Sequence, residues 1–200
     1  MSTLASMKAR IADEIMRDDL TSQIALAITD AIKHHQPKRY YFNEKDSITF
    51  TTATGYTGTT LYTIDAVFVT VNGREWLMKQ ISPVEWRILN YSGTTGQPYC
   101  WTYFQEEMRL YPIADQTYTI RLQAHYKIAE PASDDESGNV WMMDGEEVVR
   151  HRAKMLLYRD VLLDPQKAEV CFLAELEAMG SLNATTNKMA SSGIIEPMAF

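Results

Sequence analysis

The residues that could carry out chemistry are few, and their spacing matches no catalytic pattern. The sequence contains no phosphate-binding glycine loop, no G-x-S-x-G nucleophile motif, no H-E-x-x-H zinc motif and no C-x-x-C pair. His34 and His35 are adjacent on a predicted helix, where neighbouring side chains point about 100° apart, so they are not expected to chelate a metal. We therefore expect no enzyme, no catalytic residues, no metal site and no cofactor.

The remaining candidates for chemistry are better explained by structure. Cys100 and Cys171 belong to no motif that would activate a thiolate, and we expect free, buried thiols rather than a disulfide. The acidic run 134–136 stands in a turn-rich stretch, which favours a solvated loop over an acid–base pair or a metal site. His125 and His151 are expected to be packing or surface residues.

A basic and aromatic cluster resembles the surfaces that stack on nucleic acids. Lys33–Arg39 is rich in cations and is followed directly by Tyr40–Phe42. Cations in a last helical turn also complement the helix dipole, and aromatics beyond a helix anchor the next element to the core. The chain has 26 acidic against 19 basic residues and a net charge of -7, which disfavours general binding to phosphates. An acidic wall past which DNA slides remains compatible with this charge.

Length and hydropathy indicate a folded protein outside the membrane. Two hundred residues, 46% of them hydrophobic, can bury a substantial core. No apolar run reaches the roughly 18 residues that a membrane helix needs. The N-terminus is charged and amphipathic, unlike a signal peptide.

The C-terminal segment Ala184–Phe200 has an unusual pattern. It is small and polar up to Gly193 and then abruptly apolar. Pro197 excludes a regular helical finish, and we expect an extended tail. An apolar end on a polar tether suits a segment that another molecule receives, although a disordered end with incidental apolar residues stays open. The apolar residues are Ile194, Ile195, Pro197, Met198 and Phe200.

Helices are expected at both ends of the chain. Apolar residues spaced three and four apart predict helices over 3–18 and over Thr21–Gln36, with Thr21 as the N-cap. A capping-box pattern at Asp144 predicts a helix to about Leu163. Asp164-Pro165 then starts a last helix that ends near Asn183. Its expected apolar stripe is Ala168, Phe172, Leu176 and Met179.

The middle of the chain alternates with the period of two that strands have. Asn72-Gly73 predicts a hairpin turn between Ala66–Val71 and Glu75–Gln80. Ser82 and Pro83 predict the start of a short helix that runs to Leu89. The other strands are predicted at Ser47–Thr52, Thr59–Ile64, Tyr99–Phe104, Met108–Tyr111 and Tyr118–Tyr126.

These elements predict an α+β fold. Residues 1–38 and 144–183 should pack as one helical bundle, because their apolar stripes need mutual burial. Residues 39–128 should form an inserted antiparallel β-domain. Residues 129–143 read as a linker and 184–200 as the C-terminal extended tail.

Several stretches together resemble the head-to-tail adaptor proteins of tailed bacteriophages, also called connector or neck proteins. The similarity lies in the order of short structural patterns over most of the chain rather than in a catalytic motif. The stretches are Arg10–Glu14, Arg17–Ile24, Tyr40–Glu44, Met108–Ile113, Tyr118–Leu122, Arg152–Lys154, Asp164-Pro165, Thr186–Lys188 and Gly193–Pro197.

The resemblance implies a structural virion protein. It implies a ring of about twelve copies seated below the portal protein ring, around the DNA exit channel. A C-terminal extension would bind the portal, tail or nozzle proteins would dock on the opposite face, and DNA would pass without specific binding. The place implied is the virion neck, and the host cytoplasm before assembly.

A second reading treats the β-domain as a binding module. Tyr99, Trp101, Tyr103 and Tyr111 would form an aromatic stripe that reads a glycan or a peptide in a phage tail component. Aromatic stripes on strands more often belong to a core. Ring formation on a portal complex would favour the adaptor, and saturable sugar binding by the monomer would favour the binding module.

Overall fold

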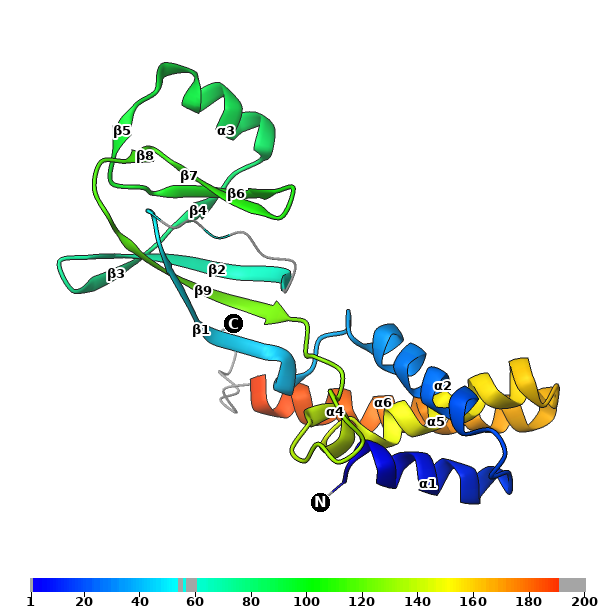
Figure 1. The fold of residues 1–200 in the computed structure, drawn as a ribbon. Coiled ribbons are helices and arrows are strands. Elements are labelled where there is room, and N and C mark those ends of the chain that lie inside the picture. The colour runs from blue at the N-terminus through cyan, green and yellow to red at the C-terminus, as the bar shows by residue number, and fades with distance from the viewer. Residues whose placement is uncertain (1, 54–55, 57–60, 191–200) are drawn as a thin grey trace, which may run out of the picture. The chain divides into compact units, whose positions relative to one another are not determined.

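The computed structural model describes residues 2–53, 56 and 61–190 and has a mixed α+β architecture (Figure 1). The chain divides into two compact units. The helical unit comprises Met1–Phe42 and Ile128–Phe200, and the sheet unit comprises Asn43–Lys127. The α+β class predicted from the sequence is therefore confirmed.

The first two helices of the helical unit are α1 (Leu4–Ile15) and α2 (Thr21–His35). Thr3 and Ser6 cap α1 through reciprocal hydrogen bonds of 3.2 and 2.8 Å. The N-cap of α2 is Leu20 and not the predicted Thr21, whose hydroxyl donates to the Asp18 carbonyl instead. The apolar residues that these helices bury are Met7, Ile11, Ile15, Ile24, Ile28 and Ile32, whereas Leu26 is exposed.

The helix predicted from Asp144 to Leu163 forms as shorter elements. α4 (Val140–Met143) begins inside the predicted linker, because the fully buried Trp141 anchors it in the core. α5 spans Glu146–Leu156, and a single π-helical turn, η3, spans Leu157–Val161. The predicted capping box at Asp144 is wrong, since Gly145 occupies the N-cap of α5 without a side-chain bond.

The last helix, α6 (Pro165–Ala190), begins as predicted and ends later than predicted. The Asp164 carboxylate caps it by accepting a hydrogen bond of 3.0 Å from the Lys167 N–H. Residues 184–190 are helical rather than extended, because no glycine or proline lies between Gly180 and Gly193. The buried Thr186 hydroxyl donates to the Leu182 carbonyl and accepts the Tyr41 backbone N–H, which holds these turns in place.

The face of α6 that packs also differs from the predicted stripe. Phe172 and Leu176 are exposed, and the buried line is Ala168, Cys171, Glu175, Ala178, Leu182 and Thr186. Ala168, Cys171 and Ala178 are small, which favours close packing of α6 on its neighbour α5, while Phe172, Leu173 and Leu176 stay exposed. The helix therefore presents apolar residues to solvent as well as to the core.

α5 is central in the helical unit, since it packs against α1, α2 and α6. A cluster of charges joins α1 to α5: the Glu14 carboxylate accepts from Arg150 at 2.8 Å and from Lys154 at 2.5 Å. Burial by itself raises the pKa of Glu14, but the two cations outweigh burial and hold the pKa below its ordinary value. Glu14 therefore stays ionised and fixes the register of α1 on α5.

The main sheet of the sheet unit has four antiparallel strands in the order β1-β9-β2-β3 (Figure 1). These strands are β1 (Glu44–Thr51), β9 (Thr119–Tyr126), β2 (Leu61–Val71) and β3 (Arg74–Leu77). Asn72 and Gly73 connect β2 to β3 with φ of 52° and 74°, which confirms the predicted hairpin. The strand predicted from Thr59 to Ile64 starts outside the described residues and continues through a register shift into β2.

The predicted strand Glu75–Gln80 divides between two sheets. Met78 is buried in the core of the unit, and β4 (Lys79–Gln80) leaves β3 to pair in parallel with β6 (Cys100–Phe104). β6 also forms the predicted hairpin with β7 (Glu107–Tyr111). β5 (Thr95–Gly96) pairs in parallel with β8 (Ile113–Ala114). The prediction of a wholly antiparallel domain is therefore wrong.

Short helical segments complete the fold. α3 (Pro83–Leu89) has Ser82 at its N-cap and Pro83 at its first position, as predicted. Two 3-10 turns, η1 (Tyr41–Asn43) and η2 (Asn90–Ser92), follow α2 and α3. The core of the sheet unit lies on one face of the main sheet, where Val67, Val69, Ile120, Leu122 and Ala124 contact Met78, Trp101 and Met108.

Candidate functional site

The predicted binding tail lies outside the part of the chain that the structure describes. Its residues are Ile194, Ile195, Pro197, Met198 and Phe200. The structure does describe the stem that leads to it, which is the end of α6 held by Thr186 against Tyr41. Residues 184–190, which were expected to belong to an extended polar tether, are therefore helical.

A buried network of ionisable side chains lies between α2, α5 and α6. His35 Nε2 lies 3.0 Å from Glu175 Oε1, and Arg152 Nη1 lies 3.5 Å from Glu175 Oε2. On its other ring nitrogen, Nδ1, His35 lies 3.2 Å from both the Tyr40 hydroxyl and Lys38 Nζ. His35 and Glu175 are almost fully buried, so the network ties the end of α2 to the middle of α6.

The charges in this network follow from burial and pairing. Burial lowers the pKa of His35 and of Lys38, and it raises the pKa of Tyr40. Burial by itself raises the pKa of Glu175, but the contact with His35 and the charge of Arg152 outweigh it, and the pKa lies below its ordinary value. At neutral pH the network holds a neutral His35 beside an ionised Glu175.

The same place brings together three possible metal ligands. Ligand atoms of His34, His35 and Glu175 lie within 4.8 Å of one another, and the two imidazole rings stand edge to face with a centroid distance of 5.0 Å. His34 is exposed and His35 is buried, so the two side chains differ in direction, and the expectation that they do not chelate a metal stays a prediction. Arg152 Nη2 lies 3.5 Å from His34 Nδ1, and Lys38 faces His35. Both cations lie beside imidazole nitrogens of this group, and their charge disfavours a metal ion at the same place.

The other predicted chemical candidates have structural surroundings. Cys100 and Cys171 are free and buried, as predicted, and burial raises the pKa of both thiols. Tyr40 is fully buried and lies edge-on to Trp141, which confirms that the aromatics after α2 anchor the chain. No activated nucleophile arises at either cysteine.

The aromatic stripe of the alternative reading belongs mainly to the core. Trp101 and Tyr111 are buried, and Tyr103 packs against the core of the sheet unit. Tyr99 alone among the four is exposed. These rings therefore do not form an open binding surface, and the stripe reading is wrong.

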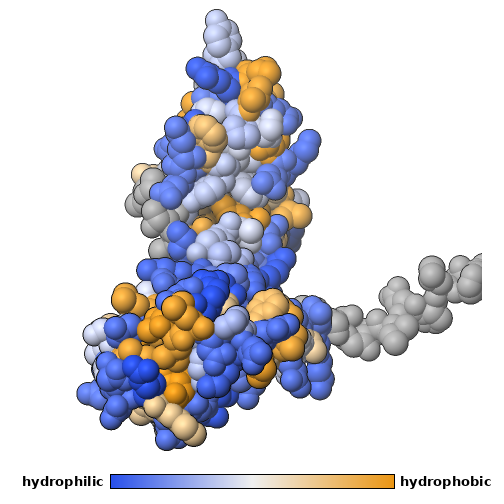
Figure 2. Space-filling view, turned by 90° about the vertical axis from the view of Figure 1, so that its right-hand side faces the viewer, coloured by the Kyte–Doolittle hydropathy of each residue, from blue (hydrophilic) through white to orange (hydrophobic). Residues whose placement is uncertain are grey.

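The helical unit carries exposed apolar surface (Figure 2). On α6, Phe172, Leu173 and Leu176 lie on the side away from the buried line, with 58% of Leu173 exposed. A separate shallow groove of about 180 Å³ lies where α2 meets the end of α5 and η3. Its lining residues are Gln23, Leu26, Ala27, Asp30, Leu156, Leu157, Asp160 and Val161.

The amino-acid sequence of this chain matches a known protein family. A family model described as SU10 adaptor protein matches residues 2–196, which is nearly the whole chain. The chain belongs to the SU10 adaptor protein family. This membership confirms the resemblance to tailed-phage head-to-tail adaptors. A search among curated proteins found no match. None of the described helices of this adaptor is long and apolar enough to cross a membrane.

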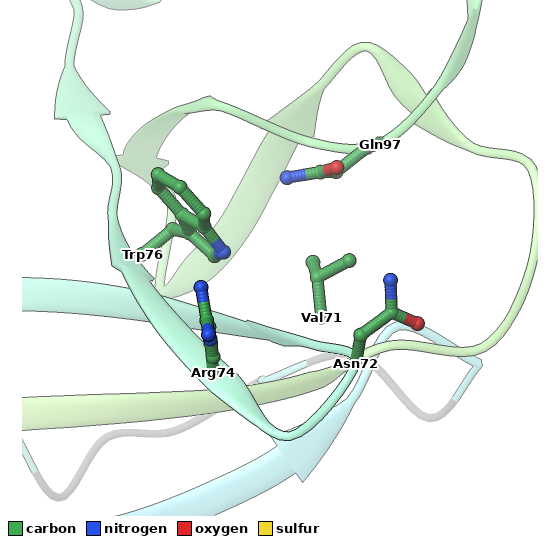
Figure 3. A pocket seen from close by; sticks show the side chains of 5 residues that line it. All are labelled: Val71, Asn72, Arg74, Trp76 and Gln97. Carbon is green, nitrogen blue, oxygen red and sulfur yellow. The ribbon is translucent and has the colours of Figure 1, made fainter.

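A further open site of this SU10 adaptor lies in the sheet unit, beside the β2–β3 hairpin. Side chains of Val71, Asn72, Arg74, Trp76 and Gln97 border a cavity of about 670 Å³ and converge on it from β2, the turn, β3 and the facing loop (Figure 3). Sequence reasoning missed this site, because only the hairpin register and the position of the loop bring Gln97 opposite Trp76. The available signal was an exposed tryptophan two residues from an arginine on a hairpin strand.

Proposed function

We propose that this adaptor forms a ring below the portal, joins the capsid to the tail and lines the channel through which DNA leaves. Membership of the SU10 adaptor family supports the coarse role of a phage adaptor. The observation that supports the ring is the exposed apolar group Phe172, Leu173 and Leu176 on α6, outside the buried line of the same helix. An exposed apolar group of this kind marks a contact with another protein.

A ring needs two different surfaces on each copy, one for each neighbour. The helical unit offers two: the outer residues Phe172, Leu173 and Leu176 of α6, and the groove between α2 and η3. We propose that the first surface of one copy packs into the second surface of the next. Asp30 and Asp160 on the groove rim keep it soluble before assembly.

The C-terminal residues are proposed to anchor the ring to the portal. Burying one large apolar side chain contributes roughly 1.5–3 kcal/mol, while ordering costs about 1–2 kcal/mol per fixed residue. One segment with Ile194, Ile195, Pro197, Met198 and Phe200 is therefore a weak anchor. Identical segments around a symmetric ring act together through high effective concentration and give a stable joint.

The DNA channel is proposed to be neutral or acidic. The net charge of -7 supports this, because dense cations would hold phosphates and slow the passage of DNA. Tail proteins would dock on the face opposite the portal. Free thiols at Cys100 and Cys171 suit the reducing host cytoplasm before assembly.

The portal contact is tested by removing Ile194–Phe200 and measuring co-sedimentation with purified portal rings. The full chain should bind, and the truncated chain should remain folded by circular dichroism and fail to bind. A matched variant with serine at the five apolar positions separates loss of side chains from loss of length. Full occupancy by the truncated chain would show that the portal anchor lies elsewhere.

A further inference from the structure

The β3 strand leaves an open edge on the main sheet. β3 is the outermost strand in the order β1-β9-β2-β3, and no strand of the described chain pairs with its far side. Val71 and Arg74 close the two-residue hairpin, and Met78 N–H donates to the Val67 carbonyl at 2.8 Å in the same register. Because hydrogen-bonded pairs alternate along an antiparallel ladder, Glu75 and Leu77 direct their backbone N–H and carbonyl groups to the open edge.

The side chains of β3 divide between two faces of the sheet. Glu75 lies on one face, where its carboxylate accepts two hydrogen bonds from Arg121 at 2.5 and 2.7 Å. Arg74 and Trp76 lie on the other face, beside Val71, and border the cavity (Figure 3). Trp76 is 56% exposed. In the described chain no acidic residue pairs with Arg74, and none lines the cavity.

The lining of this cavity selects a type of ligand. The guanidinium, the indole N–H and the two carboxamide groups of Asn72 and Gln97 are mostly hydrogen-bond donors. A guanidinium without an acid partner matches a carboxylate, which it can hold through two parallel hydrogen bonds. The face of Trp76 and the side chain of Val71 offer apolar contact next to that charge. The cavity therefore fits a carboxylate with an apolar group close by.

The open edge beside the cavity distinguishes a peptide from a small acid or a saccharide. An extended peptide can bond its backbone to Glu75 and Leu77, and its alternate side chains then fall about 7 Å apart on one face. Arg74 and Trp76 have this same two-residue spacing on β3. Short, charged edge strands are also a common protection against aggregation. An arginine without an acid partner beside a cavity is not needed for that protection.

We propose that the β3 edge and its cavity bind an extended acidic segment of a partner protein by strand addition. A carboxylate of the segment pairs with Arg74, and the apolar side chain two residues away packs on Trp76. The segment's backbone continues the main sheet past β3. This site shares no residue with the C-terminal segment or with the ring contacts proposed above, so the experiment below tests it independently of them.

The test uses the full chain, labelled with ¹⁵N, and a blocked peptide of sequence Thr-Glu-Thr-Val-Thr. We expect saturable shifts at the backbone amides of Glu75 and Leu77 and at the Trp76 indole. Replacing the peptide glutamate by glutamine, or introducing Arg74→Ala, should weaken binding by at least about tenfold. Arg87→Ala, an exposed arginine of α3 outside the cavity, is the matched control and should bind normally.

Two further probes decide between the possible occupants. N-methylation of the peptide amides that face β3 should abolish binding, because it removes the backbone donors without changing any side chain. Unchanged binding by the N-methylated peptide would overturn strand addition. Free glucuronate should cause no comparable shifts, and saturation by glucuronate at the same concentration as the peptide would overturn the assignment to a protein segment. These outcomes do not depend on how well Arg74→Ala folds.

Discussion

Glu175→Ala should cost this adaptor much of the stability of its helical unit. Glu175 is only 2% exposed and faces His35 at 3.0 Å and Arg152 at 3.5 Å. Removal leaves a buried guanidinium without its carboxylate, and breaking a buried pair in this way costs roughly 3–5 kcal/mol. Arg152 retains some access to water, with 17% of its side chain exposed, so we expect about 3 kcal/mol.

The measurement is urea unfolding followed by far-UV circular dichroism, which reports mainly on the helical unit. Glu177→Ala is the matched control, because Glu177 lies on the same helix, is exposed and has no ion pair in the described residues. It should change stability by less than about 0.5 kcal/mol. Glu175→Gln keeps the shape and should cost about 1–2 kcal/mol. A loss below about 1 kcal/mol for Glu175→Ala would refute the account of the network.

Acidification should destabilise the protein. The pKa of His35 lies below its ordinary 6.5, and the pKa of Glu175 lies below its ordinary 4.5. At acidic pH the folded state therefore binds fewer protons than the unfolded state. Their contribution is fully present above those ordinary values. It starts to fall as pH drops below 6.5 for His35 and below 4.5 for Glu175, and it is lost as pH passes their lowered folded-state pKa values. Glu175→Gln should flatten the lower part of a profile of urea midpoint against pH, and an unchanged profile would contradict this. Leu173→Asp places a charge in the proposed ring contact, so it should leave the monomer folded and weaken self-association at least about tenfold. Analytical ultracentrifugation measures this, and undiminished association would show that the contact lies elsewhere. Trp101→Ala should cost roughly 3–5 kcal/mol by urea unfolding, because Trp101 is buried in the core of the sheet unit; a loss near zero would contradict its place there.

Local signals in the sequence predicted the elements well. Asn72-Gly73 needs positive φ at both positions, and the hairpin forms there. Ser82-Pro83 and Asp164-Pro165 each start a helix, because a cap and a fixed φ act within one turn. These features depend on neighbours in the chain, so the sequence contains what is needed to predict them.

Features that depend on distant partners were predicted less well. The choice of packed face on α6 depends on how closely α5 approaches, which favoured Ala168 and Cys171 over Phe172. The end of α6 depends on Thr186 meeting Tyr41, far away in the chain. The convergence of His34, His35 and Glu175 and the cavity at Trp76 likewise require the tertiary fold.

Electron microscopy of this adaptor bound to purified portal rings tests the central proposal most directly. We predict a closed ring of adaptor density on the tail-facing side of the portal, with the helical units of neighbouring copies in contact through α6 and the α2–η3 groove. The lumen of that ring should be neutral or acidic. Adaptor density elsewhere on the portal, or single copies without contact between neighbours, would contradict the account.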